Sequence, residues 1–287
     1  MNTRKRCLIE LYISLLIMSI TTLFPKLINL PVNYIIFGRS VIAAVALYLY
    51  LKIRKKKCFI PSGKTYVIVV FTGILLALHW LALFEAIKIS SVSIGIISFF
   101  TYPVMTIFLE PLFFKNKLHL SDFILSILVI IGVYLIVPEL EFGNAVTRGV
   151  MWGLISAFLF ALRNIISKGT LNVHSGEEVM MFQLIITAFF LMPTIFIFTA
   201  DTSTVYPNIV KITILGLFFT AIPHTLLMRS LSGLKPKTVS IISSLQPFFC
   251  VTLAVLFLNE IPSIKIVIGG LFIIAAVLFE TLKSKEK

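Results

Sequence analysis

The chain has 287 residues, of which 59% are apolar (AVILMFWYC) and only 13% are charged. Water-soluble domains carry about 25% charged residues because a hydrated surface needs them, so this composition excludes an ordinary soluble protein. A helix that crosses the hydrocarbon core needs about 20 largely apolar residues, which leaves room for roughly ten crossings and for no sizeable soluble domain. The net charge is +13.

Apolar runs separated by polar or Gly/Pro-rich segments follow one another along the whole chain. Their lengths predict an all-α integral membrane protein with ten transmembrane helices. The predicted spans are residues 8–29, 33–51, 65–85, 92–113, 121–138, 149–167, 178–200, 209–228, 238–258 and 264–282. The first run follows Arg4-Lys5-Arg6 but has no small-residue cleavage site, so we expect a retained helix rather than a signal peptide.

The basic residues are distributed unevenly between the alternating connections. If the N-terminus is cytoplasmic, 18 of the 25 Lys and Arg residues fall on the cytoplasmic side and 5 on the other side, while Arg39 and Arg163 fall within spans. The positive-inside rule then places both termini in the cytoplasm and the chain in the cytoplasmic membrane. This asymmetry accounts for the basic balance without a nucleic-acid partner. The sequence leaves both a monomer and a homodimer open.

The sequence indicates neither a metal site nor a cofactor. The three cysteines, Cys7, Cys58 and Cys250, have no metal-ligand spacing and form no disulfide framework. No GxxxxGK[ST] loop occurs, so we expect no ATP hydrolysis by this chain. Energy for any transport would come from an ion gradient or from the gradient of the substrate itself.

The two halves of the chain align at a displacement of 144 residues. This displacement sets Ser98-Phe-Phe-Thr-Tyr-Pro103 against Ile242-Ser-Ser-Leu-Gln-Pro247. It also sets Arg39 against Gln183 and Trp80 against His224. Because each half holds an odd number of predicted helices, the second copy enters the membrane from the opposite side. We therefore expect two inverted five-helix repeats, residues 1–144 and 145–287, which suit alternating access.

Several stretches resemble the EamA-type transporters of the drug/metabolite transporter superfamily. They are His79-Trp-Leu-Ala-Leu-Phe-Glu-Ala-Ile-Lys-Ile-Ser-Ser-Val-Ser-Ile-Gly-Ile-Ile-Ser-Phe-Phe-Thr-Tyr-Pro103, Phe113-Phe-Lys-Asn-Lys-Leu118, Gly149-Val-Met-Trp-Gly-Leu-Ile-Ser-Ala-Phe-Leu-Phe-Ala161, Ser240-Ile-Ile-Ser-Ser-Leu-Gln-Pro247, Phe257-Leu-Asn-Glu260 and Gly269-Gly270. The resemblance implies a 5+5 inverted-repeat carrier with a central cavity that moves metabolites such as amino acids. The first span, Ser19-Ile-Thr-Thr-Leu-Phe-Pro25-Lys26, lacks the tryptophan-rich opening common in that family, so no substrate contact is carried over to it.

Ionisable side chains within spans are candidates for function, because they cost about 2.5–3.5 kcal/mol at a helix centre on insertion scales. Arg39 lies about 9 Å into the second span at 1.5 Å per residue. It either binds a substrate carboxylate or ties neighbouring segments together, and Arg163 has the same two interpretations. His79 and His224 hold nearly equivalent positions in the two halves. They either relay a coupling proton or act as hydrogen-bonding core residues.

Two prolines within predicted spans, Pro103 and Pro247, are the expected hinges, because proline removes an amide donor and frees a carbonyl one turn earlier. Neutral polar groups lie beside them and predict a midplane cavity for a neutral or zwitterionic small molecule. The aromatic side chains of Trp80, Tyr102, Trp152 and Phe160 are expected to add an apolar wall, although taken singly such residues more often pack against lipid or other helices. The predicted substrate-binding residues are Arg39, His79, Trp80, Tyr102, Trp152, His224, Ser243 and Gln246.

The leading functional hypothesis is a secondary carrier for a small metabolite, with an amino acid or a similar zwitterionic or neutral compound as the expected substrate. The alternative is a membrane-embedded lipid-modifying enzyme. Such an enzyme needs clustered acids or histidines, whereas the 12 acidic residues here are scattered and HExxH is absent. We therefore expect a transporter rather than an enzyme.

Overall fold

The computed structural model of the protein describes residues 3–55, 63–114, 118, 120–136, 143–171, 174–197, 200, 202–243 and 245–284. Across these ranges the regular elements are helices, and no strand is assigned. Cys58 and the ends of two predicted spans, residues 137–138 and 198–199, lie outside the described residues. The prediction of an all-helical chain is confirmed for the residues described.

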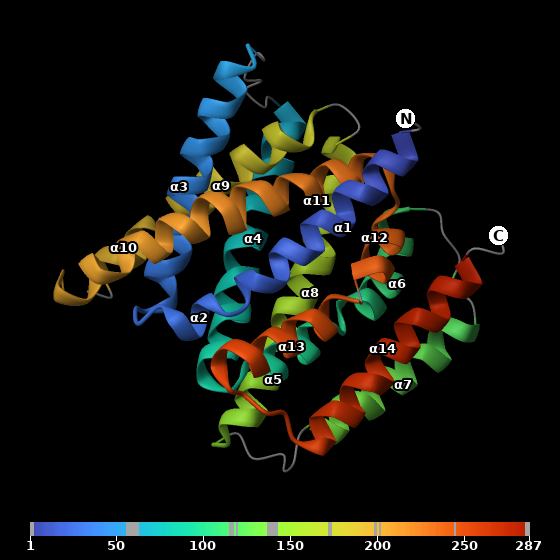
Figure 1. The fold of residues 1–287 in the computed structure, drawn as a ribbon. Coiled ribbons are helices and arrows are strands. Elements are labelled where there is room, and N and C mark those ends of the chain that lie inside the picture. The colour runs from blue at the N-terminus through green and yellow to red at the C-terminus, as the bar shows by residue number, and fades with distance from the viewer. Residues whose placement is uncertain are drawn as a thin grey trace. The chain divides into compact units, whose positions relative to one another are not determined.

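Each predicted span coincides with one helix or with consecutive helices (Figure 1). The elements are α1 (Thr3–Thr21), α2 (Phe24–Leu27), α3 (Val32–Ile53), α4 (Gly63–Ile89), α5 (Val92–Phe99), α6 (Tyr102–Phe113), α7 (Leu120–Ile136), α8 (Ala145–Leu171), α9 (Gly176–Ile197), α10 (Thr202–Gly216), the π-helix η1 (Leu217–Ala221), α11 (Ile222–Gly233), α12 (Pro236–Ser243), α13 (Gln246–Leu258) and α14 (Ile264–Ser284). Among the described residues, seven helical stretches are long and apolar enough to cross a membrane. The count of ten crossings stays a prediction.

The helices repeat at the displacement that the sequence predicts. Helices α3 and α9 are both 22 residues long and begin 144 residues apart. Helices α5 and α12 are both 8 residues long and also begin 144 residues apart. The same displacement relates the first residues of α6 and α13. The two halves of the chain therefore share one pattern of helices, including the position of the break between a short helix and its successor.

The chain divides into two compact units that combine segments from both halves. Unit 1 contains residues Met1–Leu81 and Ile166–Lys235, and unit 2 contains Ala82–Ile165 and Pro236–Lys287. Helices α4 and α8 contribute residues to both units. Neither unit therefore coincides with one of the two sequence repeats.

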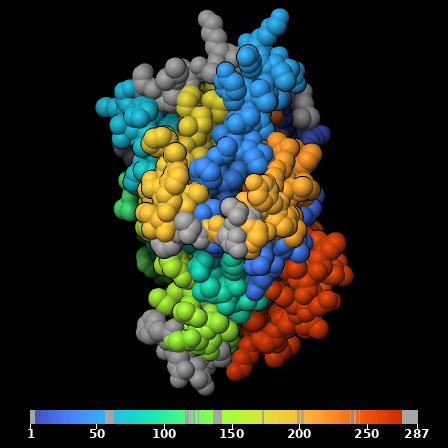
Figure 2. All heavy atoms as spheres, turned by 90° about the vertical axis from the view of Figure 1, so that its left-hand side faces the viewer, coloured from blue at the N-terminus to red at the C-terminus, as the bar shows by residue number. Residues whose placement is uncertain are grey.

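In unit 1 the matched helices α3 and α9 pack against each other in opposite directions. The Asn33 side chain, near the beginning of α3, donates from Nδ2 to the Thr194 carbonyl at 3.2 Å, near the end of α9. The Tyr34 hydroxyl donates to the next carbonyl, that of Ile195, at 2.9 Å. Figure 2 shows α3 in blue beside α9 in yellow on one face. Helix α1 packs along α11, where Ser14 Oγ donates to the Pro223 carbonyl at 2.7 Å.

In unit 2, α7 runs beside α14, its counterpart in the other half of the chain (Figure 1). Gly132 of α7 permits this approach, because a Cβ atom there would lie 2.7 Å from the Gly269 carbonyl oxygen of α14. The core of the unit is a cluster of buried aliphatic side chains from α5, α6, α7, α8 and α14. The cluster consists of Ile94, Ile97, Val104, Val129, Val150 and Ile273.

The two predicted hinge prolines lie at helix beginnings rather than within continuous helices. Helix α5 ends at Phe99 and α6 begins at Tyr102, so Pro103 stands in the first turn of α6. Pro247 holds the same place in α13, which follows α12. The first turn of a helix tolerates proline because its amides have no intrahelical partner there. Each proline therefore marks the beginning of a new helix.

Helix α8 lies unusually close to α5 because glycines and serines line their contact. A Cβ atom on Gly149 would lie 2.3 Å from Ser90 Oγ, and one on Gly153 would lie 2.5 Å from Ser98 Cβ and 3.2 Å from the Gly95 carbonyl. Membrane helices associate through such small residues because hydrocarbon supplies no hydrophobic drive between them. This contact therefore depends on close van der Waals packing.

We expect Gly153→Leu to destabilise the protein by about 1–3 kcal/mol, because the added side chain overpacks the α5/α8 contact. Thermal unfolding in detergent measures this effect. Gly169→Leu is the matched control on the same helix, since a Cβ atom at Gly169 meets nothing within 4 Å. Equal unfolding temperatures for the two variants would contradict the close packing of α8 on α5.

Candidate substrate-binding regions

A buried cluster of polar and aromatic side chains lies in unit 1, and we call it the Arg39 cluster. It consists of Arg39, Trp80, Thr220 and His224. Arg39 is completely buried, and its guanidinium carbon lies 4.1 Å from the centroid of the Trp80 ring. Its Nε atom donates to Thr220 Oγ1 at 2.8 Å. The Trp80 and His224 rings meet edge to face, with centroids 4.9 Å apart.

Four helical segments bring this cluster together: Arg39 comes from α3, Trp80 from α4, Thr220 from η1 and His224 from α11. Within η1, the Thr220 hydroxyl donates to the Leu215 carbonyl, five residues earlier, at 2.7 Å while it accepts from Arg39. Single π-helical turns inside longer helices are frequent at functional sites. Here the π-helical turn holds the acceptor of the Arg39 hydrogen bond.

Gly216 lets the segment before η1 approach the backbone of α3. A Cβ atom at this position would lie 2.8 Å from the Ile42 side chain and 3.2 Å from the Arg39 carbonyl oxygen. A larger residue would therefore push α10 and η1 away from α3. The position of Thr220 beside Arg39 depends on this close approach.

The Arg39 side chain carries the chemistry that recognises organic anions. A guanidinium group stays charged, offers five donors in a planar fork and binds carboxylates in two-point geometry. The aromatic face of Trp80 favours the cation at this depth. Both Trp80 and His224 are buried. The arrangement thus fixes one positive charge within the apolar interior of unit 1.

A second buried network surrounds Gln183, which corresponds to Arg39 in the repeat. Its Nε2 atom donates to Thr72 Oγ1 at 2.9 Å and to Ser167 Oγ at 3.0 Å. One helix turn later, Thr187 Oγ1 donates to the Gly73 carbonyl at 2.9 Å. These bonds join α9 to α4 and α8 through neutral groups. The two repeats therefore place different chemistry at matched positions, a cation in one and an amide in the other.

An aromatic cluster lies in unit 2, at the break between α5 and α6. Tyr102 stacks on Phe99 with ring centroids 5.0 Å apart, and it meets Phe160 edge to face at 4.9 Å. The ring centroid of Phe100 lies 5.4 Å from that of Tyr102. The Tyr102 side chain is also hydrogen-bonded to Ser243, at the end of α12. The cluster offers flat apolar surfaces and one phenol, which suits an uncharged part of a small molecule.

The structure thus groups five of the eight predicted substrate-binding residues into two sites. Arg39, Trp80 and His224 share the Arg39 cluster, and Tyr102 and Ser243 share the aromatic cluster. His79 and Gln246 are buried within their own units.

Trp152 differs from the other predicted residues, because it is 41% exposed and belongs to neither cluster. Arg163 is buried and donates from Nη1 to the neighbouring Asn164 side chain at 3.3 Å. That contact lies within one helix and links Arg163 to no other predicted residue.

Sequence reasoning missed Thr220, Phe99 and Phe100. Thr220 gives no signal of its own, because it is a neutral residue in an apolar run. Phe99 and Phe100 lie between the polar residues that drew attention to Pro103, and their aromatic character was the available signal. No group of three or more His, Cys, Asp or Glu side chains suited to a metal occurs in the described part of the chain.

A charged pair that the sequence did not single out lines a small pocket of unit 1. The Arg229 Nε atom lies 3.6 Å from Glu177 Oε1 and 3.7 Å from Glu10 Oε1, which joins α11 to α9 and α1. The pocket has a volume of about 280 Å³ and is otherwise mainly apolar. The three helices are therefore tied together at one end by opposite charges.

Comparison with known proteins decides the family. Residues 6–137 and 147–282 each match the EamA-like transporter family, so nearly the whole chain is covered by two matches. The chain belongs to the EamA-like transporter family. The two EamA-like matches confirm the resemblance seen in the sequence and show the two-repeat architecture. Membership makes the chain a multi-pass membrane transporter of the drug/metabolite type.

Similar proteins carry transporter names. The chain is 24% identical over 289 residues to "Uncharacterized transporter YxxF" of Bacillus subtilis, covering 99% of this chain and 92% of that one. It is 29% identical over 205 residues to an "Uncharacterized transporter" of Archaeoglobus fulgidus, covering 69% of each. A crystal structure with 14% identity shares the fold with a TM-score of 0.75 over 99% of this chain and all of that one.

Proposed function

We propose that this EamA-like protein is a secondary carrier for a small neutral or zwitterionic metabolite, with amino acids as the first class to test. The observation that carries the proposal is the completely buried Arg39 guanidinium, held by Trp80 and Thr220. A fixed buried cation favours a carboxylate, which every amino acid carries. The eight residues predicted from the sequence remain the proposed substrate-binding set.

The same proposal includes inverted five-helix repeats, residues 1–144 and 145–287, with ten crossings and alternating access. Two features of unit 1 support inversion. The matched helices α3 and α9 pack in opposite directions, and the matched residues Trp80 and His224 touch each other. A twofold axis perpendicular to the helices reverses their direction and brings matched positions together, whereas an axis along the helices leaves them parallel. Inverted repeats of this kind can exchange inward-facing and outward-facing states.

Orientation, coupling and hinge motion complete the proposal. The distribution of Lys and Arg supports cytoplasmic termini in the cytoplasmic membrane. His79 and His224 are both buried in unit 1, and we assign them the coupling proton because imidazole titrates near neutral pH. Pro103 and Pro247, at the helix breaks, are the proposed hinges.

Proteoliposomes test this function directly. Purified protein is reconstituted, and uptake and efflux of labelled amino acids and other small metabolites are measured with and without an imposed pH gradient. We expect saturable flux of at least one carboxylate-bearing compound, accelerated by a proton gradient. Lipid turnover by the purified protein, together with no saturable flux of any compound, would overturn the carrier in favour of a membrane enzyme.

A further inference from the structure

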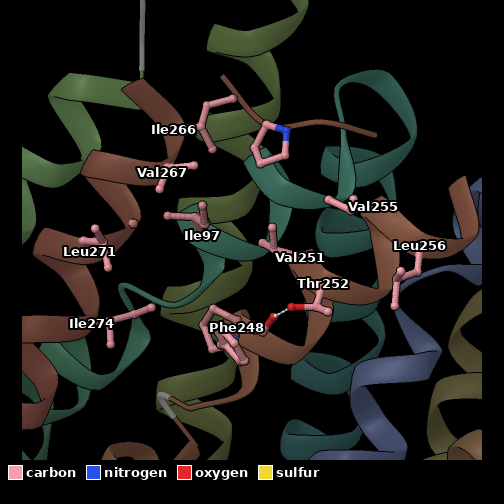
Figure 3. A pocket seen from close by; sticks show the side chains of 13 residues that line it. Ile97, Phe248, Val251, Thr252, Val255, Leu256, Ile266, Val267, Leu271 and Ile274 are labelled. Carbon is pink, nitrogen blue, oxygen red and sulfur yellow. Dashed lines mark hydrogen bonds between the residues drawn. The ribbon is translucent and has the colours of Figure 1, made fainter. Parts of the chain in front are cut away.

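Two apolar grooves lie in unit 2, at its two helix breaks. Figure 3 shows the first, in which side chains from α5, α13 and α14 turn toward one hollow, including Ile97, Val251 and Leu271. Its volume is about 400 Å³. The second lies between α6, α7 and α8 and has a volume of about 450 Å³. We call them the α13 groove and the α6 groove.

The internal repeat relates the two grooves to each other. At the displacement of 144 residues, Val104 and Phe108 of the α6 groove correspond to Phe248 and Thr252 of the α13 groove. Ile130 of α7 corresponds in the same way to Ile274 of α14. The two grooves therefore share matched walls, α6 with α7 in one and α13 with α14 in the other, whereas the third wall comes from α8 in the first and from α5 in the second. The matched walls relate the two grooves through the internal repeat, although their side chains differ.

Neither groove offers a free hydrogen-bonding side chain to a polar ligand. Thr252 Oγ1 donates to the Phe248 carbonyl at 2.8 Å, a bond drawn in Figure 3. In the α6 groove, Ser126 Oγ donates to the Phe123 carbonyl and Thr101 Oγ1 to the Ser98 carbonyl. Each of these hydroxyl groups bonds a carbonyl within four residues of its own position. The hydroxyl protons are therefore already used and the remaining lining is apolar, so the grooves favour hydrocarbon over a polar ligand.

We propose that each groove binds one acyl chain of a bilayer phospholipid. The family and the apolar helices place the protein in a bilayer, whose interior consists of acyl chains. The rim side chains Phe248, Leu256 and Ile130 are largely exposed, as lipid-facing residues are. In a bilayer the preference comes from van der Waals contact along the groove, since lipid tails are as apolar as the protein surface. The inference depends on the membrane location alone and not on the transported compound.

The test uses a phosphatidylcholine that carries a photoreactive diazirine in one acyl chain. Purified full-length protein is reconstituted with this lipid, irradiated and digested, and the labelled peptides are identified by mass spectrometry. In the unmodified protein we expect label concentrated on residues of the two grooves. In Thr252→Trp the indole fills the α13 groove, and loss of the van der Waals contacts there should lower the label on α13 and α14 by about fivefold. Label in the α6 groove should not change.

Ser126→Trp makes the reciprocal change in the α6 groove. It should lower label on α6 and α7 and leave the α13 groove unchanged. Phe257→Trp is the matched control, because Phe257 is 67% exposed on α13 and lines neither groove. Each variant is first shown to unfold at the same temperature as the unmodified protein, and a variant that fails is replaced by Val255→Phe or Phe158→Trp. Uniform labelling of all exposed apolar residues, unchanged by the groove variants, would overturn the proposal.

Discussion

Replacing Arg39 by methionine is expected to lower saturable flux at least about a hundredfold while the protein stays folded. Arg39 supplies the positive charge of the Arg39 cluster, and methionine removes it. The acceptor of its Nε hydrogen bond, Thr220, is neutral, so methionine leaves no buried charge behind at that bond. Thr220 keeps its bond to the Leu215 carbonyl when Arg39 is gone. Flux of the substrate found in proteoliposomes and the unfolding temperature in detergent are measured on the same preparation.

The two interpretations of Arg39 separate in this experiment. If Arg39 binds a carboxylate, flux falls and the unfolding temperature changes little. A purely structural tie predicts the reverse order, with the unfolding temperature falling at least as clearly as flux. Arg39→Lys is the companion variant, since lysine keeps the charge but loses the planar fork and the Nε bond to Thr220. We expect Arg39→Lys to be folded and to have a lower flux than the unmodified protein. Full flux in the methionine variant would remove Arg39 from the site.

Removing one oxygen atom from Tyr102 gives the second large expected effect. Tyr102→Phe deletes the hydrogen bond to Ser243 and keeps the ring contacts with Phe99 and Phe160. If the phenol contributes to substrate binding or to the motion at the α5/α6 break, flux should fall about tenfold, which corresponds to about 1.4 kcal/mol. Initial rates over a range of substrate concentrations tell whether KM or the maximal rate changes.

Tyr134→Phe is the matched control, because it removes the same atom from an α7 residue that is 70% exposed. Its flux should equal that of the unmodified protein. We expect the flux of Gln246→Leu to lie between the fluxes of Tyr102→Phe and Tyr134→Phe. Glu10→Gln, in α1, should have little effect on flux. Equal effects of Tyr102→Phe and Glu10→Gln would exclude the helix breaks from the substrate site.

The positions of the helices could be predicted from the sequence because each lies in an apolar run bounded by polar residues. The displacement of 144 residues could also be predicted, and it pairs Trp80 with His224. The contact between their rings could not be predicted, because an alignment of the two halves shows which positions correspond but not how far apart they lie. Thr220 was missed for a related reason. A π-helical turn depends on the packing of η1 against α3, which leaves no pattern in a run such as Leu217-Phe-Phe-Thr-Ala221.

Trp152 illustrates a second limit of sequence reasoning. In a soluble protein, an apolar stripe marks the face that a helix buries. In α8 both faces are rich in apolar residues, because one packs on protein and the other meets lipid. The sequence offered both Trp152 and Phe160 of this helix as walls of the site and could not separate them. The structure leaves Trp152 41% exposed and brings Phe160 to Tyr102.

The combination of segments in unit 1 constrains how the protein is made. Helices α1 and α3 leave the ribosome long before α11 and α9, the partners against which they pack. Until residues beyond Gly176 have been synthesised, α3 has inserted without the helix that receives its Asn33 and Tyr34 hydrogen bonds. The early helices must therefore persist in the bilayer without these partners, and their final packing waits for the second half of translation.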